Sequence, residues 1–301
     1  MDRTKYIEKH PMIMIIIGVI GISLSSIFVK YSAAPSAVTA AFRLLWTVGL
    51  MTPVVMGKKD VREELFHMNK KTVILSGLSG LFLAVHFAVW FESLRHTSVA
   101  SSTTIVCTEV IWVSLGFCLF MKGRLSGKAM VAIAVTLAGS VLIAWADSFA
   151  SGAHLYGDIL ALIAAVAVAV YTLIGRVVRL NVSTAVYTYV LYVVCAMVLV
   201  ITCFIQGQNL WGYGSSAVIV GLLLAIFSTI LGHSIFSWCL KYFSPSFVSA
   251  SKLCEPVVAA ILAGFIFGEI PTLLQIAGGV LILGGVYYYS RIENGGDINV
   301  L

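Results

Sequence analysis

The chain has 301 residues, of which 60% are hydrophobic and only 11% are charged. A soluble globular domain has about 45–50% apolar and about 25% charged residues, so this composition points to an integral membrane protein. The net charge of +6 does not indicate a nucleic-acid-binding surface, because the basic residues stand in short gaps between long apolar runs. We therefore predict an all-α integral membrane protein without a nucleic-acid partner.

Apolar runs long enough to cross a membrane, roughly 20 residues each, recur along the whole chain. The first, Met12–Val29, is too long for the apolar core of a typical signal peptide, so we expect it to be retained. The ten predicted transmembrane helices are 12–32, 36–56, 73–94, 98–121, 127–146, 157–178, 184–205, 216–240, 246–268 and 272–290. The gaps between them are too short to hold a soluble catalytic domain.

The Lys and Arg residues outside these spans set the predicted orientation. With the N-terminus in the cytoplasm, nearly all of them fall on the cytoplasmic side, and only Lys30 and Arg95 fall on the other. We expect a multi-pass protein of the cell (inner or cytoplasmic) membrane with both termini cytoplasmic. The longest loop, 57–71, is a basic connector on that side and is expected to touch anionic lipid headgroups.

The six cysteines lie within the apolar runs and show neither a CxxC pair nor a Cys/His spacing typical of metal sites. We interpret them as small apolar side chains. The sequence therefore predicts no metal and no cofactor.

An internal repeat relates the two halves of the chain. A shift of 146 residues places 93–110 on 239–256. The aligned pairs include Arg95 with Lys241, Glu109 with Glu255 and, at a shift of 147, His86 with His233. Each half holds five spans, and because five is odd the second half enters the membrane from the opposite side. We predict two inverted five-helix repeats, with substrate sites near the midplane where they meet. Their bounds are 1–146 and 156–291, followed by a short cytoplasmic tail, 292–301.

Four features follow one another in an order that resembles a known family. They are Arg43 in the second span, YGDILALIAAVAVAVYTLIGR (156–176), EPVVAAILAGFIFGE (255–269) and GGVLILGGVYYY (278–289). These are similar to motifs of EamA-type members of the drug/metabolite transporter (DMT) superfamily. The resemblance covers nearly the whole chain, and it implies ten helices in two inverted halves and transport of a metabolite, more often efflux than uptake.

The first half departs from this pattern beside its glutamate. Val110 stands where the second half has Pro256. Proline removes one helical hydrogen bond, so we predict a hinge at Pro256 beside the cavity, with a tolerated kink as the alternative. We expect the first-half helix to be less kinked. We also expect the glycines of the last span to pack closely against the ninth span.

Ionisable residues within the spans are candidates for a functional role, because burying an unpaired charge in a membrane costs several kcal/mol. The candidates for substrate binding or proton coupling are Arg43, His86, Glu109, His233, Lys252 and Glu255. Both glutamates are near the midplane, Glu109 at a depth of roughly 16 Å for a rise of 1.5 Å per residue. The alternative is internal ion pairing, of Lys252 with Glu255 at i, i+3 or of Arg43 with Glu109.

The histidines and aromatic residues extend this candidate site. Histidine titrates near neutral pH and suits proton coupling, whereas the alternative is a neutral ring hydrogen-bonded between helices. Aromatic side chains that could stack on organic cations or rings are Trp46, Trp90, Trp112, Tyr171 and Tyr187. Tryptophans near span ends have the alternative role of interface anchors.

These features predict a secondary transporter that works by alternating access, is driven by protons or by exchange, and favours export. Two anions and two cations at depth suit an amino acid, an amine or a similar zwitterion or cation. Uptake of a quaternary amine and transport of a phosphorylated metabolite are alternatives. No Walker motif is present, so ATP would not drive transport. Neither an HExxH motif nor a filter-like loop supports the other classes, an intramembrane enzyme or a channel. Substrate, protons and lipids are the expected partners, and the protein is a monomer or a homodimer.

Overall fold

The computed structural model describes residues 11–97, 99–148, 155–267 and 272–294. All regular structure in these residues is helical, which confirms the predicted all-α class. The first part of the chain forms α2 (Pro11–Lys30), α3 (Ser36–Gly57), α4 (Lys59–Phe66), α5 (Lys70–His96), α6 (Val99–Cys107), α7 (Glu109–Met121) and α8 (Gly127–Ser148). The second part forms α9 (Leu155–Arg179), α10 (Thr184–Ile205), α11 (Gly214–Leu223), the π-helix η1 (Leu224–Ser234), α12 (Ile235–Cys239), α13 (Pro245–Lys252), α14 (Glu255–Phe267) and α15 (Leu273–Asn294).

Eight described segments are long and apolar enough to cross a membrane. They are Pro11–Val29, Ser36–Gly57, Lys70–His96, Ser102–Met121, Leu155–Arg179, Thr184–Ile205, Gly214–Cys239 and Leu273–Glu293. Large apolar side chains on their outer faces, such as Phe120 and Phe204, are exposed. Because a broad exposed apolar surface is stable only in apolar surroundings, the chain is a multi-pass membrane protein.

Two of the ten predicted spans are not among these eight segments. The span 127–146 coincides with α8, whose apolar stretch is the shorter Gly127–Ile143. The span 246–268 coincides with α13 followed by α14, and its last residue lies outside the described residues, as does most of the predicted tail. The count of ten spans therefore stays a prediction.

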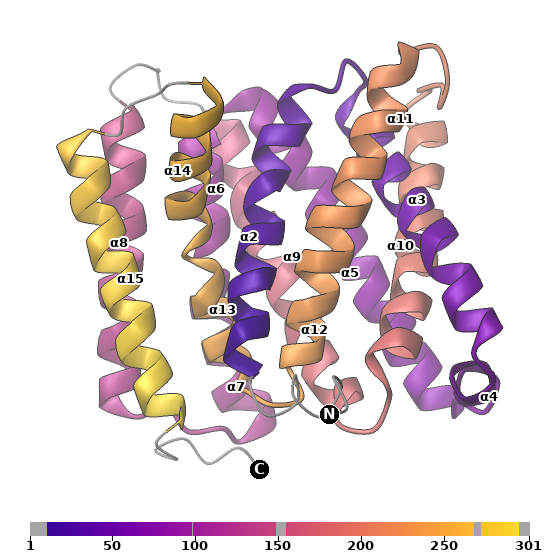
Figure 1. Cartoon of the computed structure of the whole chain (residues 1–301), viewed down its shortest axis with the longest axis horizontal. Helices are drawn as coiled ribbons and strands as arrows, with labels where there is room; N and C mark the ends of the chain where they lie inside the picture. Colours follow the sequence, from indigo (N-terminus) through magenta and orange to yellow (C-terminus); the bar gives the residue numbers. More distant parts are fainter. Residues whose placement is uncertain (1–10, 98, 149–154, 268–271, 295–301) are drawn as a thin grey trace.

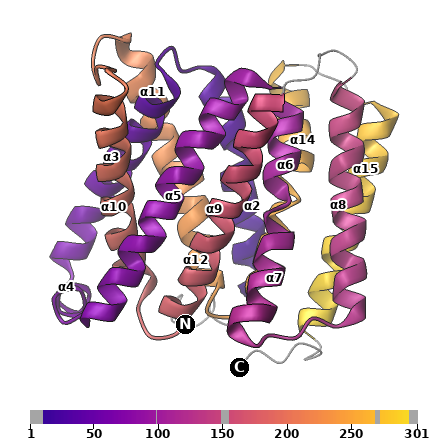
Figure 2. The same cartoon turned by 180° about the vertical axis from the view of Figure 1, so that it is seen from behind.

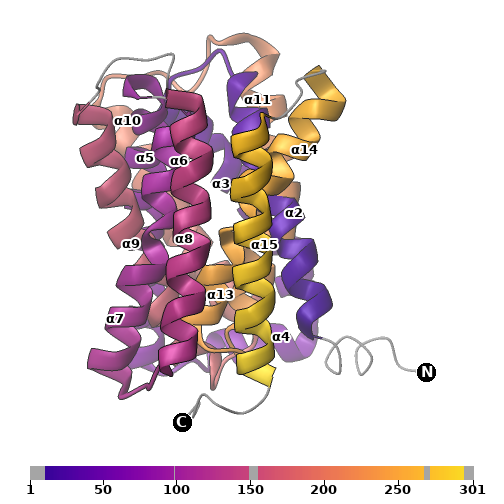
Figure 3. The same cartoon turned by 90° about the vertical axis from the view of Figure 1, so that its left-hand side faces the viewer.

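The helices stand side by side in a bundle (Figure 1). The start of α2 and the end of α15 lie at the same end of this bundle. Helices α8 and α15 pack along each other at one side, while α3, α10 and α11 form the opposite side (Figure 2). Between these sides α5 packs on α9, and α2 packs on η1 and α14. The short α13 contacts both α7 and α15, and in the side view it lies behind α8 and α15 (Figure 3).

The apolar core is divided into two clusters. One is contributed by α3, α5, α9, α10 and α11 and includes the fully buried Phe87 and Leu191. The other is contributed largely by α2, α7, α8, α13 and α15 and includes the fully buried Val110 and Phe247. The buried charged residues described below lie where the two clusters meet.

The first of two helix breaks separates α6 from α7. Thr108 N donates to Ile105 O at 3.0 Å, and Thr108 Oγ1 donates to the same oxygen at 2.6 Å. This tight turn ends α6, and Glu109 begins α7. The first-half helix is thus interrupted as well, by the single residue Thr108, and the expectation that it is the less kinked of the two stays a prediction. The break needs no proline, because a threonine hydroxyl that bonds a nearby carbonyl competes with the regular helical hydrogen bonds.

The second break lies at the repeat-matched position, between α13 and α14. Leu253 N donates to Ala250 O at 3.1 Å, which is the i to i−3 bond of a 3₁₀ turn. Glu255 then begins α14, with Pro256 in its first turn. Proline is well tolerated there because the first-turn N–H groups have no partner inside the helix. The structure thus places the bend just before Pro256, and its role as a hinge stays a prediction.

Glycines bring the backbones of α8 and α15 close together. A Cβ added at Gly278 would lie 2.7 Å from the carbonyl oxygen of Gly139, and one added at Gly139 would lie 2.6 Å from that of Gly278. Such backbone approach is possible only where side chains are absent. Gly278 and Gly285 thus face the fifth predicted span, whereas a Cβ added at Gly279 would lie 3.7 Å from Val257 of the ninth. Close packing of the last span on the ninth stays a prediction.

Candidate functional site

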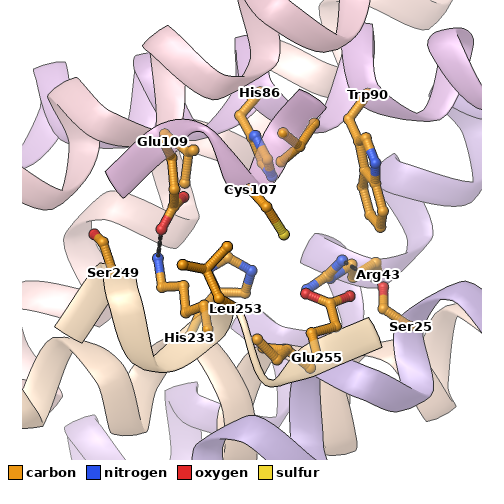
Figure 4. A pocket seen from close by; sticks show the side chains of 14 residues that line it. Ser25, Arg43, His86, Trp90, Cys107, Glu109, His233, Ser249, Leu253 and Glu255 are labelled. Carbon is orange, nitrogen blue, oxygen red and sulfur yellow. Dashed lines mark hydrogen bonds and ion pairs between the residues drawn. The ribbon is translucent and has the colours of Figure 1, made fainter. Parts of the chain in front are cut away.

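A cavity of about 60 Å³ lies beside the two helix breaks. Its lining comes from α2, α3, α5, α6, α7, α9, η1, α13 and α14, and Figure 4 shows the side chains around it. The lining residues are Ile22, Ser25, Arg43, His86, Trp90, Val106, Cys107, Glu109, Val168, His233, Ser249, Lys252, Leu253 and Glu255. All six ionisable residues predicted from the sequence as site candidates are therefore brought together.

A buried ion pair joins the two broken helices across this cavity. Lys252 Nζ of α13 lies 2.9 Å from Glu109 Oε1 of α7, with only 11% and 5% of the two side chains exposed (Figure 4). The sequence suggested Lys252 with Glu255, or Arg43 with Glu109, as the alternative to a functional role, and neither of these pairs forms. The tight turn at Leu253 separates Lys252 from Glu255, so i, i+3 spacing on one continuous helix does not apply to them.

Arg43 is 1% exposed and is held at the cavity by hydroxyl groups. Its Nε donates to Thr229 Oγ1 at 2.7 Å, and its Nη1 donates to Ser25 Oγ at 3.5 Å. The guanidinium carbon lies 4.1 Å from the centre of the Phe87 ring, which is a cation–π arrangement. The remaining nitrogen, Nη2, has no hydrogen-bond partner among the described residues. Arg43 therefore keeps one donor available.

Glu255 is the carboxylate that the protein leaves available. In Figure 4 its side chain points toward the guanidinium of Arg43. Within the described residues, no hydrogen bond or ion pair engages its carboxylate oxygens, whereas Glu109 is paired with Lys252. A carboxylate and a guanidinium that face one cavity without closing on each other can receive a ligand that carries both charges.

The two histidines meet at the wall of the cavity. His86 Nδ1 donates to Ala164 O at 3.0 Å, which leaves its Nε2 as an acceptor. The ring stacks on Trp90, with centroids 5.9 Å apart and planes inclined by 12°. His233 lies 6.5 Å from His86 between ring centroids, and its Nδ1 has no partner among the described residues. The hydrogen bond of His86 fits the alternative of a neutral ring between helices, while His233 keeps a free nitrogen.

Three of the five predicted aromatic residues are buried. Trp90 lines the cavity, and its indole N–H has no partner in the described part of the chain. Tyr171 does not line the cavity but packs on His233, with 6.1 Å between the ring centroids. Its hydroxyl forms a hydrogen bond with that of Ser237. Tyr187 is fully buried and bonds Ser79 instead.

Trp46 and Trp112 lie outside this cavity. They are 36% and 37% exposed, and Trp46 Nε1 donates to Val218 O at 3.1 Å. Neither lines the cavity of about 60 Å³, so the structure does not place these two predicted cavity aromatics at it. The interface-anchor alternative suits them better.

Sequence reasoning missed several polar residues of the site. Ser25 and Ser249 line the cavity, and Thr229 orients Arg43. Each stands with other serines in an otherwise apolar run, so the signal was a group of small hydroxyl residues at membrane depth. The π-helix η1 was also missed, although it carries both Thr229 and His233, and π-helical segments often occur at functional sites.

Comparison with known proteins adds the family context. Residues 155–291 match the EamA-like transporter family. A protein of Archaeoglobus fulgidus named "Uncharacterized transporter" is 23% identical over 255 residues, covering 82% of this chain and 85% of its own. "Uncharacterized transporter YxxF" of Bacillus subtilis is 24% identical over 301 residues, covering 99% of this chain and 93% of its own. A crystal structure matches with a TM-score of 0.77 at 17% identity, covering 95% of this chain and 98% of that chain, and this likeness concerns the fold alone.

Proposed function

Because the chain belongs to the EamA-like transporter family of the DMT superfamily, we propose that it moves a small organic metabolite by alternating access. The metabolite carries an amine or is a zwitterion, such as an amino acid. Transport is coupled to protons or to exchange, export is the favoured direction, and the metabolite is not chemically changed. The protein resides in the cell membrane with both termini in the cytoplasm.

Ten spans in two inverted five-helix repeats, 1–146 and 156–291, provide the proposed moving parts. Packing between the halves supports this arrangement. The extensive contacts between a helix of one half and a helix of the other have counterparts between the repeat-matched helices. Helix α5 packs on α9 as η1 packs on α2, and α6 and α7 pack on α9 as α14 packs on α2. The Gly139–Gly278 approach maps onto the approach of Ala132 and Gly285, where a Cβ on Gly285 would lie 3.1 Å from Ala132 O.

The observation that carries the proposal is the Glu255 carboxylate, which no described residue pairs with, in a buried cavity at a helix break matched by Glu109. Burial favours the protonated form of a carboxylate, and nearby cations favour its charged form. Glu255 faces Arg43 in this cavity, so the protein balances both effects. Such a group can release its proton when an ammonium group binds and regain the proton when that group leaves.

The size of the central cavity supports a moving site. Its volume of about 60 Å³ is well below the roughly 300–1,000 Å³ of typical ligand pockets, so a metabolite enters only when the halves move apart. Larger cavities, of about 470 Å³ and 380 Å³, lie at the α2–α3 and α9–α10 connections. Arg95 lines the first and Lys241 the second, and the repeat aligns these two residues. They are the proposed mouths at the two ends.

Transport by reconstituted protein tests this function. Proteoliposomes are loaded with a panel of amino acids, polyamines and quaternary amines, and proton movement is followed with a pH-sensitive dye. The wild type should show saturable solute flux that moves protons. Glu255→Gln should still bind solute and lose the coupled flux, because a neutral amide cannot exchange a proton. Glu109→Gln should reduce flux as well, by leaving Lys252 without its partner.

Glu92→Gln is the matched control, since Glu92 is a partly exposed carboxylate that pairs with His96 at the end of α5. It should transport like the wild type. Normal coupled flux in both cavity variants would make the glutamates structural. Flux that never saturates would indicate a channel, and consumption of the solute would indicate an enzyme.

A further inference from the structure

Hydroxyl groups on one side of α13 lead away from the central cavity. Ser249 lines the cavity beside Lys252, and Ser246 follows one turn farther along the helix. Both serines are 0% exposed, and neither hydroxyl has a hydrogen-bond partner among the described residues. Since buried hydroxyls are nearly always bonded to protein or ordered water, two unpartnered ones on successive turns indicate a place for bridging water.

This row of polar side chains, here called the file, continues from Ser249 and Ser246 of α13 onto α15, which packs against α13 (Figure 3). Tyr289 is 1% exposed, and its ring packs on that of Phe247 of α13, with 5.4 Å between the centroids. Its own hydroxyl has no hydrogen-bond partner in the described part of the chain. It therefore stands between Ser246 and the end of the bundle where α15 terminates.

Glu293 closes the file at that end. One helical turn beyond Tyr289, its carboxylate accepts hydrogen bonds from the backbone N–H of Ser244 and, at 3.0 Å, from the Ser244 hydroxyl. Glu293 is only partly buried, so solvent reaches it. The polar groups of Ser249, Ser246, Tyr289, Ser244 and Glu293 thus form a sequence from the central cavity to the surface of the bundle.

We propose that this file, bridged by water, carries protons between Glu293 and the central carboxylates. Each serine or tyrosine hydroxyl accepts a proton on one side while donating its own on the other, so the file is unchanged after one proton has passed. The proton ends on a central carboxylate or returns to solvent through Glu293. This inference rests on the proposed proton coupling.

Charged groups flank both ends of the file. At the surface end, the positive charge of Arg176 of α9 attracts the Glu293 carboxylate. Arg176 also donates a hydrogen bond to Leu240 O. At the cavity end, Lys252 of α13 pairs with Glu109 of α7, and Glu255 of α14 faces the same space. The file therefore connects Glu293, near one cation, with the cavity that holds both the ion-paired Glu109 and the available Glu255.

Two middle positions of this file are apolar in the other half of the chain. At the repeat-matched positions, Ser246 corresponds to Ala100 and Tyr289 corresponds to Ile143. Alanine and isoleucine side chains neither donate nor accept hydrogen bonds. Protons should therefore reach the central carboxylates through the Glu293 end even when the opposite mouth is closed.

A pH step applied to solute-free proteoliposomes on a solid-supported membrane tests the path, with protons as the only probe. The wild type should show a fast charge displacement as the cavity takes up protons. Tyr289→Phe and Ser246→Ala should each slow it roughly tenfold, as expected when one hydrogen-bonded step is lost, with little change in its final amplitude. Ser251→Ala is the control, because the Ser251 hydroxyl on the same helix bonds its own Phe247 O at 2.8 Å.

The outcomes separate this path from the proposed function. Unchanged displacement rates in both variants, with the variants folded as judged by thermal unfolding, would overturn the path and leave transport standing. The same holds if the wild type moves solute but displaces no charge after a pH step. Slowed displacement in a protein that moves no solute of the panel would support the path and overturn the assigned solute class.

Discussion

The two broken helices share a backbone plan and differ in their charges. Both α6–α7 and α13–α14 stop at a tight turn and restart at a glutamate. Only the second carries a lysine one turn before its glutamate, and at the matched position the first has Val106. That one lysine reaches across the cavity and neutralises the glutamate of the opposite helix rather than its own neighbour.

This difference shows how a symmetric scaffold obtains two unequal carboxylates. Two identical buried glutamates in one small cavity would repel each other, and one of them would remain protonated. With a single lysine, Glu109 becomes a fixed ion pair that ties α7 to α13, and Glu255 stays available near Arg43. The asymmetry thus assigns a structural role to one helix break and the exchangeable site to the other.

The largest expected effect comes from removing this lysine. Lys252→Met should destabilise the protein by about 3–5 kcal/mol, because Glu109 would stay buried without its partner. Adding Glu109→Gln to Lys252→Met should recover most of this loss, since a neutral amide removes the unpaired charge. Thermal unfolding in detergent, followed by the reactivity of buried cysteines, measures the cycle of four proteins. Equal losses in the single and double variants would contradict the assigned ion pair.

A smaller effect is expected where the halves meet at α8 and α15. Gly278→Ala adds the methyl group that the first half already carries at the matched Ala132, so perfect symmetry would make it harmless. At Gly278, however, a Cβ would lie only 2.7 Å from Gly139 O, which is backbone and cannot easily move. We expect a loss of about 1–3 kcal/mol from overpacking, measured by the same unfolding assay. Gly284→Ala has nothing within 4 Å of its added Cβ and serves as the control.

The sequence predicted the features that depend on composition and pattern. Long apolar runs define helices in a membrane with little ambiguity, which is why the helices of the bundle agree with the predicted segments. Charges are costly at membrane depth, so six ionisable residues within spans marked the cavity before its geometry was known. The match of residues 155–291 to the transporter family agrees with the resemblance read from the motifs.

The partners within the cavity could not be predicted in the same way. Lys252 pairs with Glu109 because a tight turn at Leu253 separates Lys252 from Glu255. The sequence does not show this turn, so the i, i+3 spacing wrongly suggested that Lys252 and Glu255 share one helix face. Trp46 and Trp112 looked like cavity residues because helix periodicity is weak when lipid and core are both apolar. Proline was the expected signal for a helix break, and a threonine hydroxyl at Thr108 produces one without it.

The smallest expected effect concerns how each break is made. Thr108→Val removes the hydroxyl that bonds Ile105 O and keeps the shape of the side chain, so we expect a loss of about 0.5–1.5 kcal/mol. Pro256→Ala should cost about 0.4–1 kcal/mol, because the proline mainly restricts the unfolded chain at a position that suits it. If both breaks are built into the packing, the double variant should lose only the sum of the two. A loss well above that sum in thermal unfolding would show that the two turns depend on each other across the Glu109–Lys252 pair. The lysine would then couple the halves mechanically as well as electrostatically.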